Sequence, residues 1–211
     1  VLRVMRDRIS SPLELLAAQA KDEHPRVRLE AVVAASFFED ARAAAVALEA
    51  QRFPTDKFLD YALKETMRAL DPIWRAAIAR GEIIGADNPA AMSYLLGIVT
   101  PAELAKLPRL PGVLKALLSR HGVDRGERLR AASDIAKAEG KAVVSVVMDA
   151  IRQTDSGKGN HARHVLHELG MLMQAMMADG KMPQRAGLAE LASSGRHPEA
   201  RQLGYAGMIA L

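Results

Sequence analysis

One short pattern occurs near both ends of the chain and restricts the folds that the sequence can adopt. Residues 24–31 read His-Pro-Arg-Val-Arg-Leu-Glu-Ala, and residues 197–204 read His-Pro-Glu-Ala-Arg-Gln-Leu-Gly. In both copies a proline suits the first turn of a helix, and a small apolar residue follows two positions later. An arginine comes next, and a small residue lies three positions beyond the arginine. Such repetition predicts a fold built from repeated helical units. The residues that carry the pattern are Pro25, Val27, Arg28 and Ala31, and Pro198, Ala200, Arg201 and Gly204.

The pattern has a physical interpretation. A small residue at its last position would let one helix approach its neighbour closely. The arginine can lay its stem over the packed face and reach carbonyl or carboxylate oxygens of the adjacent unit. The segment 128–132, Arg-Leu-Arg-Ala-Ala, could be a degenerate third copy.

Helix starts are marked by a capping residue followed by proline. Ser11-Pro12 and Thr100-Pro101 each have a glutamate at the third helical position, which predicts a capping box, and Asn88-Pro89 repeats the cap without the glutamate. Aromatic residues make up only 4% of the chain, and the apolar residues recur at spacings of three and four, so we expect helices connected by short loops. The predicted helices cover residues 12–22, 25–38, 40–51, 56–70, 72–80, 89–98, 101–106, 111–120, 125–138, 141–153, 161–178, 184–193 and 198–211.

The repeated pattern resembles the second helix of a HEAT repeat. This resemblance implies an all-α fold over residues 1–211, a HEAT-like α-solenoid of stacked antiparallel helix pairs. The loop 155–160, Asp-Ser-Gly-Lys-Gly-Asn, could subdivide the stack; it lacks the spacing of a phosphate-binding loop. Since the chain begins without methionine and stops inside a predicted helix, we expect it to be a piece of a longer polypeptide.

Two stretches resemble a narrower group of proteins. Residues 24–31, with Asp-Tyr-Ala-Leu-Lys-Glu-Thr-Met-Arg-Ala-Leu at 60–70 and Asp-Pro-Ile-Trp at 71–74, are similar to a helical segment of large multidomain haem-binding proteins of planctomycetes and verrucomicrobia. Residues 196–206 resemble the last helical repeat before the c-type cytochrome domain of that family. The resemblance implies a periplasmic or secreted module that links a dehydrogenase-like propeller to a cytochrome c domain. Because the haem-attaching cysteines and histidine have no counterpart here, it transfers no catalytic residue and no cofactor to this chain.

The composition excludes several kinds of chemistry. The chain has no cysteine, which excludes disulfides and thiolate metal sites, and no apolar run approaches the length of a membrane span. Its 29 basic and 25 acidic residues are interspersed, which indicates a solvated helical surface and argues only weakly for nucleic acid as a partner.

Three histidines form the candidate metal site. His161, His164 and His167 are three residues apart on a predicted helix, so consecutive members lie on roughly the same face. His161 and His164 are the pair that we predict could bind a metal ion, against the alternative of capping or partly buried histidines.

Two other features have alternative interpretations. The methionines of 171–182 would either fill an irregular core or form an exposed partner-binding patch. Trp74 is either a core residue or, as in HEAT-like DNA glycosylases, part of a basic concave groove.

The function that we expect is a non-catalytic scaffold. It would bind flanking domains of the same polypeptide, and a protein partner on a concave face. The alternative is a HEAT-like nucleic-acid-binding or base-excising domain, which would require lysines and arginines concentrated along one groove.

Overall fold

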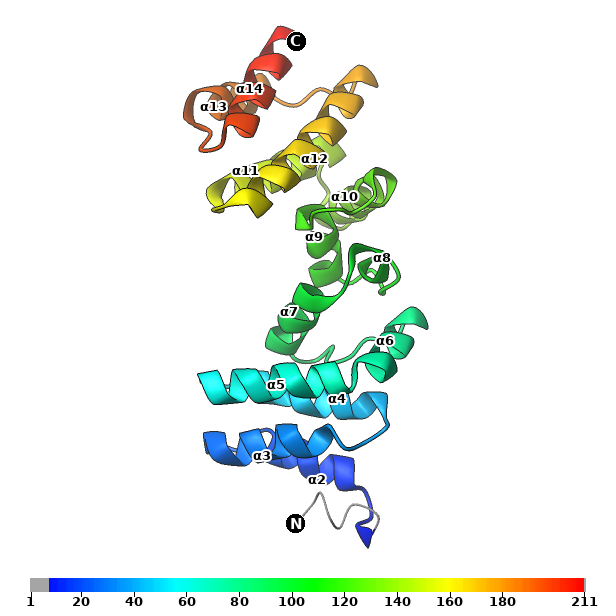
Figure 1. The fold of residues 1–211 in the computed structure, drawn as a ribbon. Coiled ribbons are helices and arrows are strands. Elements are labelled where there is room, and N and C mark those ends of the chain that lie inside the picture. The colour runs from blue at the N-terminus through cyan, green and yellow to red at the C-terminus, as the bar shows by residue number, and fades with distance from the viewer. Residues whose placement is uncertain (1–7, 211) are drawn as a thin grey trace. The chain divides into compact units, whose positions relative to one another are not determined.

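The computed structural model describes residues 8–210 of the 211-residue chain. All regular secondary structure in this range is helical, without a strand, which confirms the predicted all-α class (Figure 1). Leu211, the last residue of the helix predicted over 198–211, lies outside the described residues.

The chain divides into two compact units. Among the described residues, the first contains 8–99 and 106–108, and the second contains 100–105 and 109–210. The loop 155–160, where the sequence suggested a division, lies inside the second unit.

In the first unit, α2 packs on both α3 and α4, and α4 packs on α3, α5 and α6. α3 also packs directly on α5, so these two helices lie side by side (Figure 1). Burial of apolar residues at helical spacing holds this packing together, as at Leu59, Leu63 and Met67, which are four positions apart and each at most 2% exposed. The elements of the first unit are α2 (Pro12–Gln19), α3 (Pro25–Ala35), α4 (Ala41–Leu48), the 3-10 helix η2 (Glu49–Arg52), α5 (Lys57–Ala69), α6 (Asp71–Ala79) and α7 (Pro89–Ile98).

In the second unit, α9 packs on α10 and α11, α10 on α11 and α12, and α11 on α12. α14 packs on both α12 and α13. The elements of the second unit are α8 (Pro101–Leu104), α9 (Pro111–Ser119), α10 (Arg125–Glu139), α11 (Val143–Ser156), α12 (Asn160–Ala178), α13 (Arg185–Ser194) and α14 (Pro198–Ala210).

The capping predictions have different outcomes. Thr100 and Glu103 form the predicted capping box, and Asn88 Oδ1 accepts hydrogen bonds from the backbone of Ala90 and Ala91. The box predicted at Ser11 was wrong, because Ser11 has left-handed backbone angles (φ 59°, ψ 53°) and its side chain makes no capping bond. A capping hydroxyl needs an extended backbone to reach the free N–H groups of the first turn.

The helix predicted over 141–153 ends later than expected, at Ser156. Asp155 on this extra turn is buried and accepts hydrogen bonds from the backbone N–H groups of Arg196 (2.7 Å) and His197 (2.8 Å). These bonds join the end of α11 to the start of α14. The connection between α11 and α12 is therefore reduced to residues 157–159.

Candidate functional site

The arginine of the first motif copy is a buried clamp. Arg28 is 3% exposed, and its Nη1 donates to the carbonyl oxygens of Asp22 (2.9 Å) and Glu23 (2.8 Å). Its Nη2 donates to the carbonyl of Pro54 (3.0 Å). The side chain thus connects the turn before α3 to the segment before α5.

Arg128, in the degenerate segment, has the same kind of partners. It is 1% exposed and donates to the carbonyls of Leu118 and Arg120, at the end of α9. Its Nη2 also lies 2.5 Å from Glu168 Oε2 on α12. Burial lowers the pKa of Arg128, and the carboxylate of Glu168 opposes this shift.

The last motif copy repeats the arrangement near the surface. Arg201 Nη1 donates to the carbonyls of Gly195 (2.8 Å) and Arg196 (3.0 Å), in the turn between α13 and α14. All three arginines therefore donate to backbone carbonyls in the turn or helix end that precedes their own helix. Their role is structural.

The small residues at the last position of the motif are buried in all three segments. Ala31 and Ala131 are buried, and Gly204 is buried where α14 crosses α13. A Cβ atom placed on Gly204 would lie 2.6 Å from the carbonyl oxygen of Leu188 and closer still to the backbone nitrogen of Ala192. Only glycine fits this approach of backbone to backbone.

The first unit carries an open apolar groove along α3 and α5. It has a volume of about 740 Å³, and its walls include Leu29 and Val33 on one side and Phe58, Tyr61 and Ala62 on the other. Phe58 is 62% exposed and Tyr61 is 67% exposed. Two adjacent exposed aromatic rings over an apolar groove are typical of a protein-binding surface.

The charges at this groove are few. Glu65 forms an ion pair with Arg68 (2.7 Å), so these two charges offset each other. Lys57 Nζ lies 5.0 Å from the centre of the Phe58 ring and remains as a cation at the end of the groove where α5 begins.

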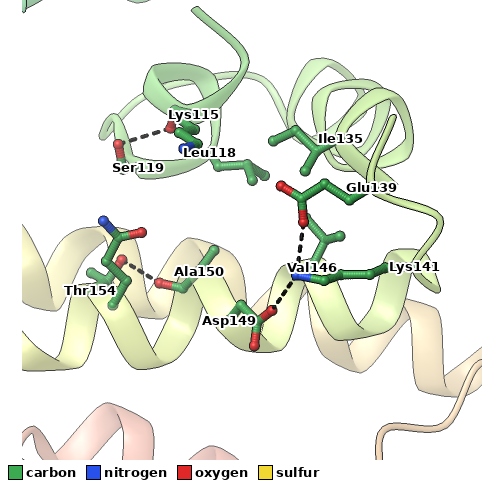
Figure 2. Close-up of a pocket in the computed structure, with 11 residues that line it drawn as sticks. Lys115, Leu118, Ser119, Ile135, Glu139, Lys141, Val146, Asp149, Ala150 and Thr154 are labelled. Carbon is green, nitrogen blue, oxygen red and sulfur yellow. Dashed lines mark hydrogen bonds and ion pairs between the residues drawn. The ribbon is translucent and has the colours of Figure 1, made fainter. Parts of the chain in front are cut away.

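A smaller pocket of about 230 Å³ lies between α9, α10 and α11 (Figure 2). Lys141 reaches across it to Glu139 (2.8 Å) and Asp149 (3.6 Å). The hydrogen bond that Lys141 donates to Glu139 raises the pKa of Lys141 and favours its charged form. The pocket thus places these ion pairs beside the apolar side chains of Leu118 and Ile135.

The predicted histidines lie on the exposed side of α12. His161, His164 and His167 are all exposed, and the structure brings His164 into ring contact with His121, in the turn after α9. The two ring centres are 4.9 Å apart, and the rings are tilted by 59°. His121 was not expected from the sequence, because it precedes His164 by 43 positions and no spacing rule connects them.

The pocket at these histidines has a volume of about 460 Å³. His121, His164 and His167 line it together with Glu168 and other polar residues of α12 and α14, whereas His161 does not. Among residues 8–210, no group of three or more histidine, cysteine, aspartate or glutamate side chains is arranged to hold a metal ion.

The exposed fractions of Trp74 and of the methionines of 171–182 test whether these side chains are core or surface residues. Trp74 is 1% exposed, and its Nε1 donates to the carbonyl of Met67 (2.8 Å), which confirms the core interpretation. Met173 and Met176 are also buried, while Met171 is 50% exposed. Met177 and Met182 are half-buried, so the cluster is part core and part surface.

The comparisons with known proteins identify no relative. No family model, curated protein sequence or solved structure matches the chain. In the part of the chain that the structure describes, no helix is both long and apolar enough to cross a bilayer.

Proposed function

We propose that this chain is a non-catalytic module of HEAT-like helix pairs that binds an amphipathic helix of a partner protein. The observation that carries the proposal is the apolar groove of α3 and α5, with Phe58 and Tyr61 exposed along it. Aromatic side chains of this kind are enriched among the hot-spot residues that carry most of the binding free energy at protein interfaces.

The packing order supports the HEAT-like part of the proposal. Successive pairs would be α2–α3 and α4–α5 in the first unit, and α9–α10, α11–α12 and α13–α14 in the second. First helices pack on first helices (α2 on α4, α9 on α11), and second helices pack on second helices (α3 on α5, α10 on α12, α12 on α14). Stacked repeats bury their cores in this way, and they present one helix of each pair on a shared face.

The shape and charge of the groove indicate what kind of partner helix it could bind. Phe58, Tyr61, Ala62 and Glu65 follow the helical spacing of three and four along α5, and the 13 residues of α5 extend over about 20 Å. A partner helix of about a dozen residues, with apolar anchors at the same spacing, would fill this length. An acidic residue at one end of it would face Lys57.

The resemblance of residues 24–31 and 60–74 to multidomain haem-binding proteins suggests where that helix comes from. We propose a flanking domain of the same polypeptide, such as a cytochrome c domain, as its source. This part of the proposal rests on the resemblance alone.

The experiment is a selection of helical peptides from a displayed library on the wild-type chain. A variant that carries both Phe58→Ser and Tyr61→Ser serves as the counter-target, and Tyr205→Ser, which alters an aromatic residue 56% exposed on α14, is the matched control. Fluorescence anisotropy then measures the affinity of each selected peptide.

We expect selected peptides with apolar residues at three- and four-residue spacing and an acidic end. Loss of the two aromatic anchors should cost at least about 2 kcal/mol, a decrease in affinity of roughly thirtyfold, whereas the control should bind like the wild type. Peptides that bind the double variant as tightly as the wild type would show that the groove is not the binding surface.

A further inference from the structure

The histidine pocket of the second unit has the elements of a small metal site. The rings of His121 and His164 come from different elements, the turn after α9 and the first turns of α12, and their centres are 4.9 Å apart. Two imidazoles that bind one ion at about 2.1 Å with tetrahedral geometry have ring centres roughly 5 Å apart. The observed separation therefore already fits a shared ion.

The orientation of His121 is fixed by its neighbours. Its Nδ1 lies 2.8 Å from Glu168 Oε1. Glu168 is held in turn by Arg128 Nη2 (2.5 Å) and by the backbone N–H of Gly122 (3.1 Å). When the carboxylate accepts the Nδ1 proton of an imidazole, the lone pair of Nε2 is left free to bind a metal.

We propose that His121, through Nε2, and His164 together bind one divalent transition-metal ion of the class of Zn²⁺ or Cu²⁺, with Glu168 as the positioning residue. Imidazole nitrogens are preferred ligands of these ions. Since the described residues offer no third side chain in position, water completes the coordination shell. The bound ion is therefore exchangeable and open to an external ligand.

This site differs from the pair that the helical spacing suggested. His161 and His164 are three residues apart on α12, but His161 does not line the pocket, while His121 does. The cation would also face little repulsion, because Arg163 at the rim is paired with Glu199 (2.9 Å) and Arg128 is paired with Glu168. The site lies in the second unit, so its test does not depend on the groove of the first.

The test is calorimetric titration of the full chain with Zn²⁺, with Cu²⁺ paramagnetic resonance as a second measurement. The variants are His121→Gln, His164→Gln, Glu168→Gln and, as the matched control, His161→Gln. Circular dichroism of each variant confirms that it is folded, which is expected because all three histidines are exposed.

We expect Zn²⁺ binding to be lost in His121→Gln and in His164→Gln and to be unchanged in His161→Gln. Loss of the orienting carboxylate in Glu168→Gln should weaken binding by about 10- to 100-fold. The Cu²⁺ spectrum should show two nitrogen ligands in the wild type and one in either single variant. Equal Zn²⁺ affinity of the wild type and the His121→Gln, His164→Gln double variant would overturn the proposal, and so would a loss of binding in the His161→Gln control.

Discussion

Replacement of Gly204 by alanine tests the close approach of α14 to α13. Alanine would place its Cβ atom 2.6 Å from the carbonyl oxygen of Leu188, whereas ordinary van der Waals contact begins at 3.4 Å. The obstacle is backbone of α13, which cannot rotate out of the way as a side chain can. α14 must therefore move away from α13 by about 0.8 Å or more, which loosens the packing of Ala200 and Leu203.

Two opposing terms set the size of the effect. Overpacking of a close contact costs about 1–3 kcal/mol, and the upper end applies here because the contact is with backbone. Alanine in a helix interior is favoured over glycine by about 1 kcal/mol. The net expectation for Gly204→Ala is a loss of about 2 kcal/mol in the free energy of unfolding of the second unit.

The assay is urea unfolding followed by circular dichroism, together with hydrogen exchange of the amides in α13 and α14. Exchange is needed because two compact units need not unfold in a single two-state transition. Gly170→Ala on α12 is the matched control, since a Cβ atom there would meet nothing within 4 Å and should stabilise the helix by up to about 1 kcal/mol. If Gly204→Ala proves as stable as the wild type, or more stable, the close approach is not a constraint and the reasoning fails.

Two further substitutions test the polar connections of the second unit. Asp155→Asn should lower stability at pH 7 by about 2 kcal/mol, because charged hydrogen bonds to the start of α14 are weakened. Burial acts to raise the pKa of Asp155, but the hydrogen bonds from the backbone of His197 and Arg196 outweigh it and the net pKa is lowered from 3.8. Because the folded pKa of Asp155 is lowered, the carboxylate contributes stability that is fully present above the unfolded pKa and is lost as the pH falls through the lower folded pKa. The stability gap between wild type and variant should therefore start to narrow as the pH falls below the unfolded value of 3.8, and a gap that stays constant on further acidification would contradict the assignment. Arg128→Met should cost about 3–5 kcal/mol in urea unfolding, because it removes a charged partner of Glu168 and a donor to two backbone carbonyls, and a loss below about 1 kcal/mol would show that the arginine is dispensable.

The elements that could be predicted from the sequence are those with local causes. Thr100 and Asn88 cap their helices as expected because the capping residue, its proline and the free N–H groups all lie within four positions. Gly204 was assigned to a close helix contact because its position in the motif matches Ala31, and the structure places it against the backbone of α13. Such features depend on neighbours along the chain, so spacing alone reveals them.

Features that depend on distant residues were missed. The extra turn of α11 is held by Asp155 binding the N–H groups of Arg196 and His197, about 40 positions away. His121 meets His164 only because α9, α10 and α12 pack together, and nothing in the sequence near His121 indicates a partner on α12. Periodicity predicts which face of a helix is exposed, but it does not predict which residue of another helix lies opposite.

The two copies of the His-Pro motif show why a shared pattern does not imply a shared function. His24 accepts a hydrogen bond at Nδ1 from the backbone of Arg26 and caps its own helix, and no distant residue is needed for this. His197 is buried, and its Nδ1 lies 3.1 Å from Asp155 on another helix. In the first copy, the backbone N–H of Arg26 donates to His24 within the same helix start. In the second, the carboxylate of Asp155 on α11 accepts from the backbone N–H groups just before α14 and so joins two helix pairs. The proline and the arginine therefore define the repeat, because their roles are the same in both copies. The histidine has a different hydrogen-bond partner in each copy.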